Sequence, residues 1–184
     1  MRQKNSERFQ KLTVLIPSDD RNLVISTFQA HDISVEYVSW LNDKSLMRYS
    51  NQRFLEHTWD TCEQYLASFL NTPNQFLAIK NSSGNLVGTM TMYVQDMHGT
   101  VDLGIMIGPA YASRGIGTHA WLTVCTHLEN DENIRKITAG CASSNLPMIR
   151  LAEKSGMTLE GRRLQQEIYD DVAVDILLYG KMTR

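Results

Sequence analysis

Hydrophobic and polar positions follow two different periods along this 184-residue chain. Apolar residues at every third or fourth position are typical of amphipathic helices, and short apolar or alternating runs are typical of strands. The pattern predicts strands at 12–16, 22–28, 75–80, 86–95, 101–107, 136–142, 158–168 and 172–182. It predicts helices at 34–41, 58–70, 116–128 and 146–154.

Turn and cap residues support several of these boundaries. Ser34 is a suitable N-cap for the first helix, and Gly156 is a suitable residue after the end of the last helix. The turn at 81–85 joins two predicted strands as a hairpin. From residue 22 onward the order of elements is β-α-α-β-β-β-α-β-α-β-β, which predicts an α/β fold with a partly antiparallel sheet. No linker or repeat interrupts the chain, so we expect a single domain over 1–184 with a polar N-terminal extension at 1–20.

Composition excludes several classes of function. The chain is 42% hydrophobic and 21% charged, with a formal net charge of -2 and no basic stripe, so we expect no nucleic-acid partner. No apolar run approaches the roughly 20 residues that span a bilayer, so we expect no membrane partner. Cys62, Cys125 and Cys141 are odd in number and show no paired spacing. This pattern predicts free thiols and a cytoplasmic protein.

A candidate phosphate site lies between the predicted strand at 101–107 and the helix that follows. A proline and a loop of small residues separate the two elements, and the helix begins near Gly115. Such a loop aims unpaired backbone N–H groups and the helix dipole at one point, which favours an anion. Because Gly115 and Gly117 lack a Cβ, we expect the anion to lie directly on the main chain.

This loop resembles the coenzyme A pyrophosphate loop of the GNAT (Gcn5-related) N-acetyltransferase superfamily, whose signature is Arg/Gln-x-x-Gly-x-Gly/Ala. The matching positions are 112–117, with Ala112 in the place of the usual Arg or Gln and Arg114 as the alternative positive charge. The resemblance implies a mixed, mostly antiparallel sheet flanked by helices, with acetyl-CoA in a cleft between two splayed strands. The coenzyme-binding residues that it implies here are Ile105, Met106, Ile107, Ala112, Ser113, Arg114, Gly115, Ile116, Gly117 and Thr118.

Two alternatives remain for the same loop. Residues 115–120 also fit the dinucleotide fingerprint Gly-x-Gly-x-x-Gly/Ala, which would indicate a nucleotide-binding oxidoreductase. In a Rossmann unit, however, the first glycine follows the strand almost at once, whereas Pro109 and several further residues intervene here. The other alternative is a glycine-rich turn that binds no ligand.

A second stretch, 145–157, resembles the family's Asn-x-x-(Ser/Ala)…Glu-Lys-x-Gly-Phe segment, and the pattern at 161–163 and 175–180 continues that of ribosomal-protein N-terminal acetyltransferases. The resemblance implies that Asn145 faces the pantetheine arm; the alternative is that it only caps the helix. Ala152 stands where many members carry a tyrosine that protonates the departing thiolate. Other possible donors are Ser144, Ser155 and Tyr111.

An amine must be neutral when it attacks a thioester, so the reaction needs a proton acceptor. Asp102 lies in the strand where family members often carry a glutamate in this role, and strand alternation puts it on one side with Gly104 and Met106. Its alternative role is that of an ordinary carboxylate at a strand start. His57 is the best neutral-pH base outside the strand. The resemblance points to the N–H groups around Met106 and Ile107 for the oxyanion.

The segment 37–50 is similar to that in GNAT enzymes that acetylate amino groups of nucleotide-linked sugars. The candidate acceptor-binding residues in this segment are Trp40, Arg48 and Tyr49, and a fourth candidate, Arg53, lies just beyond it. Cations and aromatic rings of this kind suit a sugar or a phosphate. The alternative is that Trp40 packs at a helix end and that the cations are surface charges.

These observations predict an acetyl-CoA-dependent N-acetyltransferase that acts by direct transfer to a primary amine. The leading candidate acceptor is a nucleotide-linked amino sugar. A protein N-terminal amine is the alternative acceptor, and a non-catalytic acyl-CoA sensor is the alternative from another class. We expect acetyl-CoA as co-substrate and a monomer or homodimer. We expect no metal, because His119 and His127 are eight residues apart without a carboxylate pattern.

Overall fold

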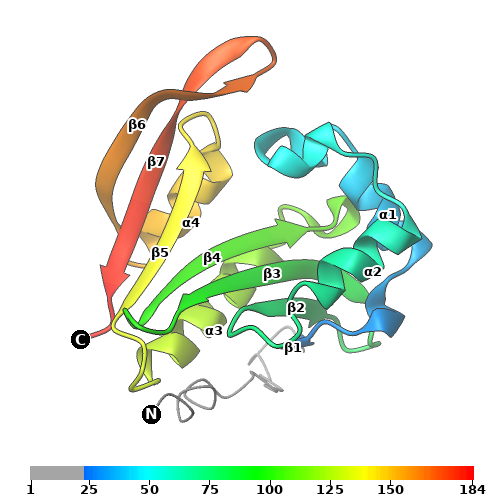
Figure 1. Cartoon of the computed structure of the whole chain (residues 1–184), viewed down its shortest axis with the longest axis horizontal. Helices are drawn as coiled ribbons and strands as arrows, with labels where there is room; N and C mark the ends of the chain where they lie inside the picture. Colours follow the sequence, from blue (N-terminus) through cyan, green and yellow to red (C-terminus); the bar gives the residue numbers. More distant parts are fainter. Residues whose placement is uncertain (1–22) are drawn as a thin grey trace.

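The computed structural model describes residues 23–184, so the predicted extension at 1–20 and the strand at 12–16 lie outside the described residues. The described chain forms a seven-stranded sheet of order β1-β2-β3-β4-β5-β7-β6 (Figure 1). Its strands are β1 (Val24–Thr27), β2 (Gln75–Lys80), β3 (Leu86–Gln95), β4 (Thr100–Ile107), β5 (Lys136–Ala142), β6 (Thr158–Tyr169) and β7 (Val172–Met182). Its α-helices are α1 (Val35–Asn42), α2 (Trp59–Ala67), α3 (Ile116–Glu129) and α4 (Leu146–Lys154).

Each helix and strand predicted from residue 22 onward is present, and the α/β fold class is confirmed. Ser34 caps α1, since its Oγ accepts a hydrogen bond of 3.1 Å from the Tyr37 N–H. Helix α2 ends before the predicted residue 70, because the chain turns after Ser68. The pattern missed four short 3₁₀ helices: η1 (Ala30–Asp32), η2 (Leu46–Tyr49), η3 (Asn51–Phe54) and η4 (Pro109–Tyr111).

The sheet opens between β4 and β5, the one parallel pair among its neighbouring strands. These strands pair over three positions, from Thr100 with Lys136 to Asp102 with Thr138. Beyond Asp102, β4 continues beside β3 while β5 continues beside β7. The two strands therefore diverge, as Figure 1 shows, and the predicted splay is confirmed.

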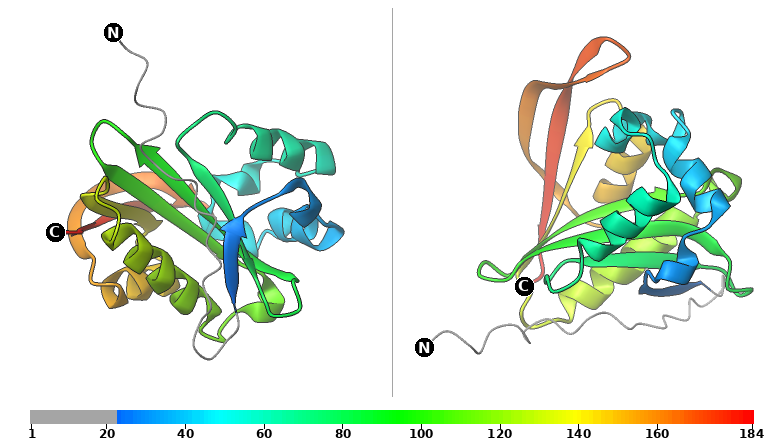
Figure 2. Two further views of the ribbon diagram at one scale, coloured as in Figure 1. Left: turned by 90° about the horizontal axis from the view of Figure 1, so that it is seen from below. Right: turned by 45° about the vertical axis from the view of Figure 1, so that its right-hand side comes forward.

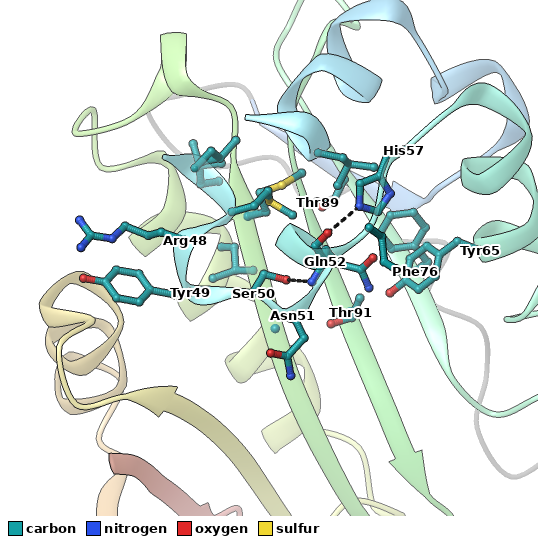
Figure 3. Close-up of a pocket in the computed structure, with 18 of the residues that line it drawn as sticks. Arg48, Tyr49, Ser50, Asn51, Gln52, His57, Tyr65, Phe76, Thr89 and Thr91 are labelled. Atoms are coloured by element: carbon teal, nitrogen blue, oxygen red, sulfur yellow. Dashed lines mark hydrogen bonds between the residues drawn. The ribbon is translucent and has the colours of Figure 1, made fainter. Parts of the chain in front are cut away.

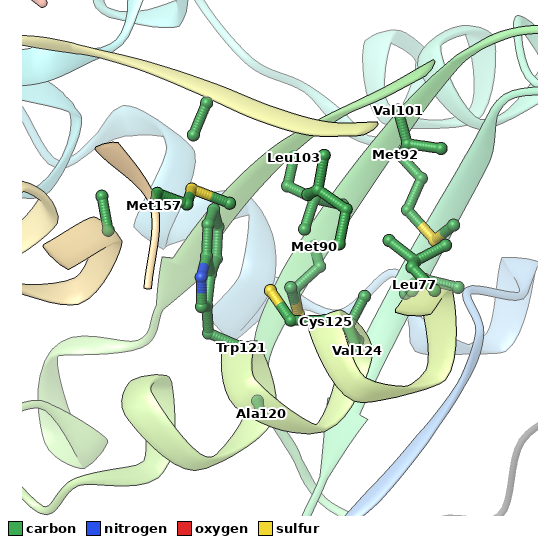
Figure 4. Packing of buried hydrophobic residues seen from close by; sticks show 14 of the residues in the cluster. Leu77, Met90, Met92, Val101, Leu103, Ala120, Trp121, Val124, Cys125 and Met157 are labelled. Atoms are coloured by element: carbon green, nitrogen blue, oxygen red, sulfur yellow. The ribbon is translucent and has the colours of Figure 1, made fainter. Parts of the chain in front are cut away.

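Two apolar clusters pack on the opposite faces of the sheet (Figure 2). On the α3 face, Trp121 is fully buried and its Nε1–H donates to Ser155 Oγ at 3.1 Å, within a cluster that includes Met90 and Val101 (Figure 4). On the α1 and α2 face the cluster is largely aromatic. There the Phe76 ring centroid lies 4.4 Å from that of Phe28. Both faces are thus covered, which leaves the splay as the open part of the sheet.

The β6–β7 hairpin extends past the end of the sheet, on one side of the splay, and η2 and η3 lie on the other side (Figure 1). Most residues of β6 are exposed. Cys62, Cys125 and Cys141 are buried free thiols, as predicted. Within residues 23–184, no helix has the length and apolar character needed to cross a membrane.

Candidate active site

A cavity of about 1250 Å³ occupies the splay and the α1 and α2 face beside it. Its walls come from β4 at residues 103–107, from β5 at Gly140 and Cys141, from α4, and from the segment that carries η2 and η3. Gly104 lines the cavity, and a Cβ there would lie 2.6 Å from Thr91 Oγ1. A side chain at this position would therefore collide with the neighbouring strand.

A second cavity of about 520 Å³ adjoins the first, between β5, the β6–β7 hairpin and η3. Asp102 and Thr138 line this second cavity and not the first. The residues that line both cavities are Tyr49, Asn51, Gly140 and Cys141. The splay thus holds two adjoining cavities: Asp102, at the end of the parallel β4–β5 pairing, lines the second, and Leu103, the next residue, lines the first.

The predicted phosphate loop has the backbone that an anion site needs. Ser113 and Gly115 have positive φ angles of 60° and 75°, and Gly115 is the N-cap of α3. The first α-helical hydrogen bond runs from the His119 N–H to the Gly115 carbonyl at 3.0 Å. The N–H groups of residues 115–118 therefore have no intrahelical carbonyl partner. Such groups at a helix N-terminus can donate hydrogen bonds to an anion. Of the loop residues 112–118, Ala112 lines the main cavity.

Gly117 has a packing role that the sequence did not predict. A Cβ at Gly117 would lie 3.2 Å from Ile107 Cγ1 and 3.9 Å from Ile105 Cδ1. Its missing side chain therefore allows α3 to pack closely on β4, and the expected contact of its main chain with an anion stays a prediction. Gly115 has a left-handed backbone, which favours glycine at this position for a reason separate from ligand contact.

The register of β4 corrects the choice of oxyanion donors. The Gly108 N–H donates to the Val87 carbonyl of the β3 side at 2.9 Å, and Met106 is paired with Thr89 in the same register. Because hydrogen-bonding direction alternates along a strand, the Met106 N–H points toward β3. The N–H groups of Ile105 and Ile107 point into the splay instead. The strand register supplies this information, which the apolar pattern alone does not contain.

Asn145 both caps a helix and lines the main cavity. Its Oδ1 accepts a hydrogen bond from the Met148 N–H at 3.2 Å, so it is the N-cap of α4. The cap uses the side-chain oxygen, and the amide NH₂ can still donate to a carbonyl of a ligand. The two alternatives considered for this residue are therefore compatible.

None of the three proposed proton donors to the thiolate lines either cavity. Ser155 is buried, accepts from Trp121, and donates to the Ala152 carbonyl at 2.8 Å. Tyr111 packs edge-on against Trp40, with ring centroids 6.4 Å apart. Ser144 contributes its backbone carbonyl to a contact with Tyr49. The suggestion that one of them serves as the acid is not supported by their positions.

Asp102 is exposed along the second cavity, and its Oδ1 accepts a hydrogen bond of 2.6 Å from Thr138 Oγ1. The surrounding protein desolvates the carboxyl and raises its pKa above the ordinary value, while the Thr138 hydrogen bond opposes that rise. Asp102 also pairs with Tyr93 across β3, as Gly104 does with Thr91. These pairs put Asp102, Gly104 and Met106 on one face of the sheet, as predicted.

His57 lies in the main cavity at the end away from Arg48 and Tyr49 (Figure 3). It is 8% exposed, and Asn42 binds both its backbone N–H and its carbonyl, at 2.9 and 2.8 Å. Its Nε2 lies 3.0 Å from the Gln52 carbonyl oxygen. A neutral imidazole must donate from that nitrogen, so Nδ1 is the one atom left to accept a proton.

The four candidate acceptor-binding residues separate into two pairs. Arg48 and Tyr49 line the main cavity, whereas Trp40 and Arg53 do not. Trp40 is 4% exposed and packs beneath Gly108, where a Cβ would lie 2.3 Å from Trp40 Cζ2. The prediction that Trp40 contacts the acceptor is corrected: it belongs to the aromatic core.

Arg53 is likewise engaged with the protein itself. Its guanidinium donates to the carbonyls of Ser50 at 2.8 Å and Ile168 at 2.9 Å. The same group lies 4.2 Å from the ring centroids of both Phe54 and Tyr169. Arg53 therefore joins η3 to the end of the β6–β7 hairpin, and its predicted contact with the acceptor is corrected.

The main cavity has a polar floor that was not predicted from the sequence. Thr89, Thr91 and Tyr93 of β3 line it, and the Tyr93 hydroxyl lies 3.2 Å from that of Tyr65 on α2. Burial raises the pKa of Tyr65, so its hydroxyl keeps its proton. The signal was present: these polar residues alternate with buried apolar ones between residues 89 and 94, which indicates one solvated face. Across residues 23–184, no group of three or more His, Cys, Asp or Glu side chains could hold a metal ion.

Residues 22–158 match the sequence profile of the acetyltransferase (GNAT) domain. A comparison with curated proteins finds no match.

Solved structures of acetyltransferases share the fold at low sequence identity. One is RimL, a ribosomal alpha-N-protein acetyltransferase in complex with coenzyme A, with a TM-score of 0.81 and 14% identity over 91% of this chain and 97% of that chain. Another is the Vibrio cholerae spermidine N-acetyltransferase with CoA and spermine, with a TM-score of 0.78 and 17% identity over 88% and 96%. A third is the microcin self-immunity acetyltransferase MccE with acetyl-CoA and AMP, with a TM-score of 0.78 and 18% identity over 91% and 98%.

Proposed function

Because this chain belongs to the GNAT family of acetyltransferases and is an acetyl-CoA-dependent N-acetyltransferase, we propose that it transfers acetyl directly to the primary amine of a nucleotide-linked amino sugar. The observation that carries this proposal is the end of the β4–β5 pairing, where Asp102 lines the second cavity and Leu103, the next residue, lines the main cavity. A carboxylate at that border is suited to receive a proton from an amine that attacks a thioester in the splay.

The coenzyme would use backbone groups on one side of the splay. The N–H groups of residues 115–118 suit its pyrophosphate, and Arg114 adds positive charge beside them. The pantetheine arm would follow β4, with the Asn145 amide as a hydrogen-bond donor. In this arrangement the thioester carbonyl lies near the inward N–H groups of Ile105 and Ile107.

The chemistry is an acyl transfer in a ternary complex. Asp102 takes a proton from the ammonium, directly or through a water, and the neutral nitrogen attacks the thioester carbonyl carbon. Backbone N–H groups stabilise the negative charge that develops on the carbonyl oxygen. The C–S bond then breaks, the nitrogen loses its second proton as the amide forms, and that proton passes through water to the departing coenzyme A thiolate. Because a thiolate is a stable leaving group, the alanine at position 152 does not prevent the reaction.

Two observations favour the nucleotide-linked acceptor. Arg48 and Tyr49 stand side by side in the cavity wall, and a guanidinium beside a ring suits a phosphate and a sugar or base (Figure 3). The MccE structure, which has this fold, holds AMP together with acetyl-CoA. A protein N-terminal amine is the second candidate, because the RimL structure of the same fold belongs to an alpha-N-protein acetyltransferase.

The test begins with calorimetric titration of acetyl-CoA, with NAD as the control ligand. Binding of acetyl-CoA alone supports the coenzyme site, whereas binding of NAD alone would support the oxidoreductase alternative. Turnover is then measured with a nucleotide-linked amino sugar and with a peptide that has a free N-terminus. Binding without turnover of any amine would favour the sensor alternative.

The role of Asp102 is tested by Asp102→Ala. We expect kcat to fall about 10²- to 10⁴-fold, because general base catalysis is lost. The Kd for acetyl-CoA should stay within about twofold, because Asp102 lines the second cavity and lies outside the phosphate loop. Unchanged turnover in this variant, with intact binding, would show that another group is the base, and His57→Ala would be the next variant to measure.

A further inference from the structure

Tyr49 connects the two sides of the splay by a single hydrogen bond. It ends η2 on the acceptor side and lines both cavities. Its hydroxyl donates to the Ser144 carbonyl at 2.9 Å, across 95 residues of sequence. Ser144 directly precedes Asn145, the N-cap of α4 that lines the main cavity. The bond therefore joins the segment at 46–54 to the turn that orients Asn145.

The same carbonyl is part of the turn itself. The Ser144 oxygen also accepts from the Leu146 N–H at 3.0 Å, at the point where α4 begins. A second donor from Tyr49 restrains this peptide group from the opposite side of the splay. The position of the Asn145 side chain thus depends on the acceptor-side segment as well as on its own helix.

Neighbouring groups fix the direction of the Tyr49 hydroxyl. The ring meets Tyr169 edge-on at 5.7 Å between centroids, and the Arg48 guanidinium lies 4.8 Å from the Tyr49 ring centroid. Arg53 adds a parallel connection through the Ile168 carbonyl at 2.9 Å. Segment 46–54 is consequently attached both to the hairpin and to the β5–α4 turn.

We infer that Tyr49 is a positioning residue whose hydroxyl couples order in the acceptor-side segment to binding of the coenzyme arm at Asn145. This inference rests on the proposed function, because it requires acetyl-CoA to contact Asn145. Coenzyme bound at Asn145 holds the Ser144–Asn145 turn in place, and the Tyr49 hydrogen bond passes that restraint to segment 46–54. In the reverse direction, an ordered segment favours the turn that binds the coenzyme.

The test uses Tyr49→Phe, which removes the hydroxyl and keeps the ring against Tyr169 and Arg48. We expect the Kd for acetyl-CoA, measured by calorimetry, to rise about 3- to 10-fold, as the loss of one hydrogen bond predicts. In the wild-type protein, acetyl-CoA should slow amide hydrogen exchange in residues 46–54. In the variant that protection should be lost, while protection at the phosphate loop remains.

Thr183→Val is the matched control. It removes a hydroxyl that donates to the Ile134 carbonyl at 2.7 Å, also between segments far apart in sequence, and Thr183 lines neither cavity. The control should keep the wild-type Kd and the coenzyme-dependent protection of residues 46–54.

The outcomes separate this inference from the proposed function. A wild-type Kd in Tyr49→Phe, or a raised Kd with protection of residues 46–54 intact, would overturn the coupling and leave the proposed function standing. Failure of the wild-type protein to bind acetyl-CoA would overturn both. An equal loss of affinity in Thr183→Val would show a general loss of stability in place of a specific link, and would also overturn the inference.

Discussion

The coenzyme side and the acceptor side of the splay are constructed by different means. On the coenzyme side, the backbone determines the shape: Gly108, Gly115 and Gly117 permit close packing or a positive φ within ten residues of one another. On the acceptor side, side chains determine the shape. Tyr49 reaches Ser144 across 95 residues, and Arg53 reaches Ile168 across 115.

This difference has a physical consequence for function. A loop whose form follows from local backbone preferences is present before the ligand binds, which suits a coenzyme common to every turnover. A segment attached by a few exposed hydrogen bonds and ring contacts opens at a lower free energy than the core. The acceptor side is therefore the side on which binding is expected to change the order of the chain.

Gly108→Ala tests the contact between the coenzyme side and α1, where the two sides of the splay touch. The added Cβ would lie 2.3 Å from Cζ2 of the buried Trp40 ring, so α1 or the end of β4 must shift. We expect the free energy of unfolding to fall by about 1–3 kcal/mol, as overpacking predicts, measured by urea denaturation. Gly161→Ala is the control, because its nearest contact is 3.6 Å away. Equal stability of the two variants would contradict the packing of the coenzyme side on α1.

Gly140→Ala tests the shape of the junction between the two cavities without a large change in the free energy of unfolding. Its Cβ would meet nothing closer than 3.9 Å, and Gly140 lines both cavities. We expect unfolding to change by less than about 0.5 kcal/mol, since no core contact is altered. We expect kcat/KM for the acceptor to fall about tenfold, because a methyl group at the junction displaces the reacting amine. A variant with full activity would mean that the amine does not pass this junction.

The sequence was sufficient for those features that depend on local periodicity. Strand and helix order, the Ser34 cap and the loop before α3 all follow from neighbouring residues, and the structure contains each of them. The face shared by Asp102, Gly104 and Met106 follows from strand alternation in the same way. Such features need no knowledge of the fold.

Other features depend on contacts between distant segments, and sequence reasoning failed there. Trp40 and Arg53 look like ligand-binding residues by type, but one is buried in an aromatic core and the other holds the hairpin. The 3₁₀ helices η2 and η3 are too short to show a period. The exclusion of Met106 from the oxyanion donors required the register of β4 against β3.

Thr138→Val is the smallest change that tests the border of the two sides, because Thr138 and Asp102 form the last parallel pair before the splay. The threonine hydroxyl donates to the Asp102 carboxylate and lowers its pKa, against the rise caused by desolvation from the surrounding protein. Without that bond the pKa of Asp102 rises further, so at a given pH less of the carboxylate is ionised. Asp102 can accept a proton only in its ionised form, so the ascending limb of kcat/KM against pH should move to higher pH. Thr158→Val, outside both cavities, should keep the wild-type limb. Because the wild-type protein and both variants are measured with the same acceptor, ionisation of the amine affects each pH profile equally. A limb that stays in place in Thr138→Val would therefore mean that Asp102 does not control it.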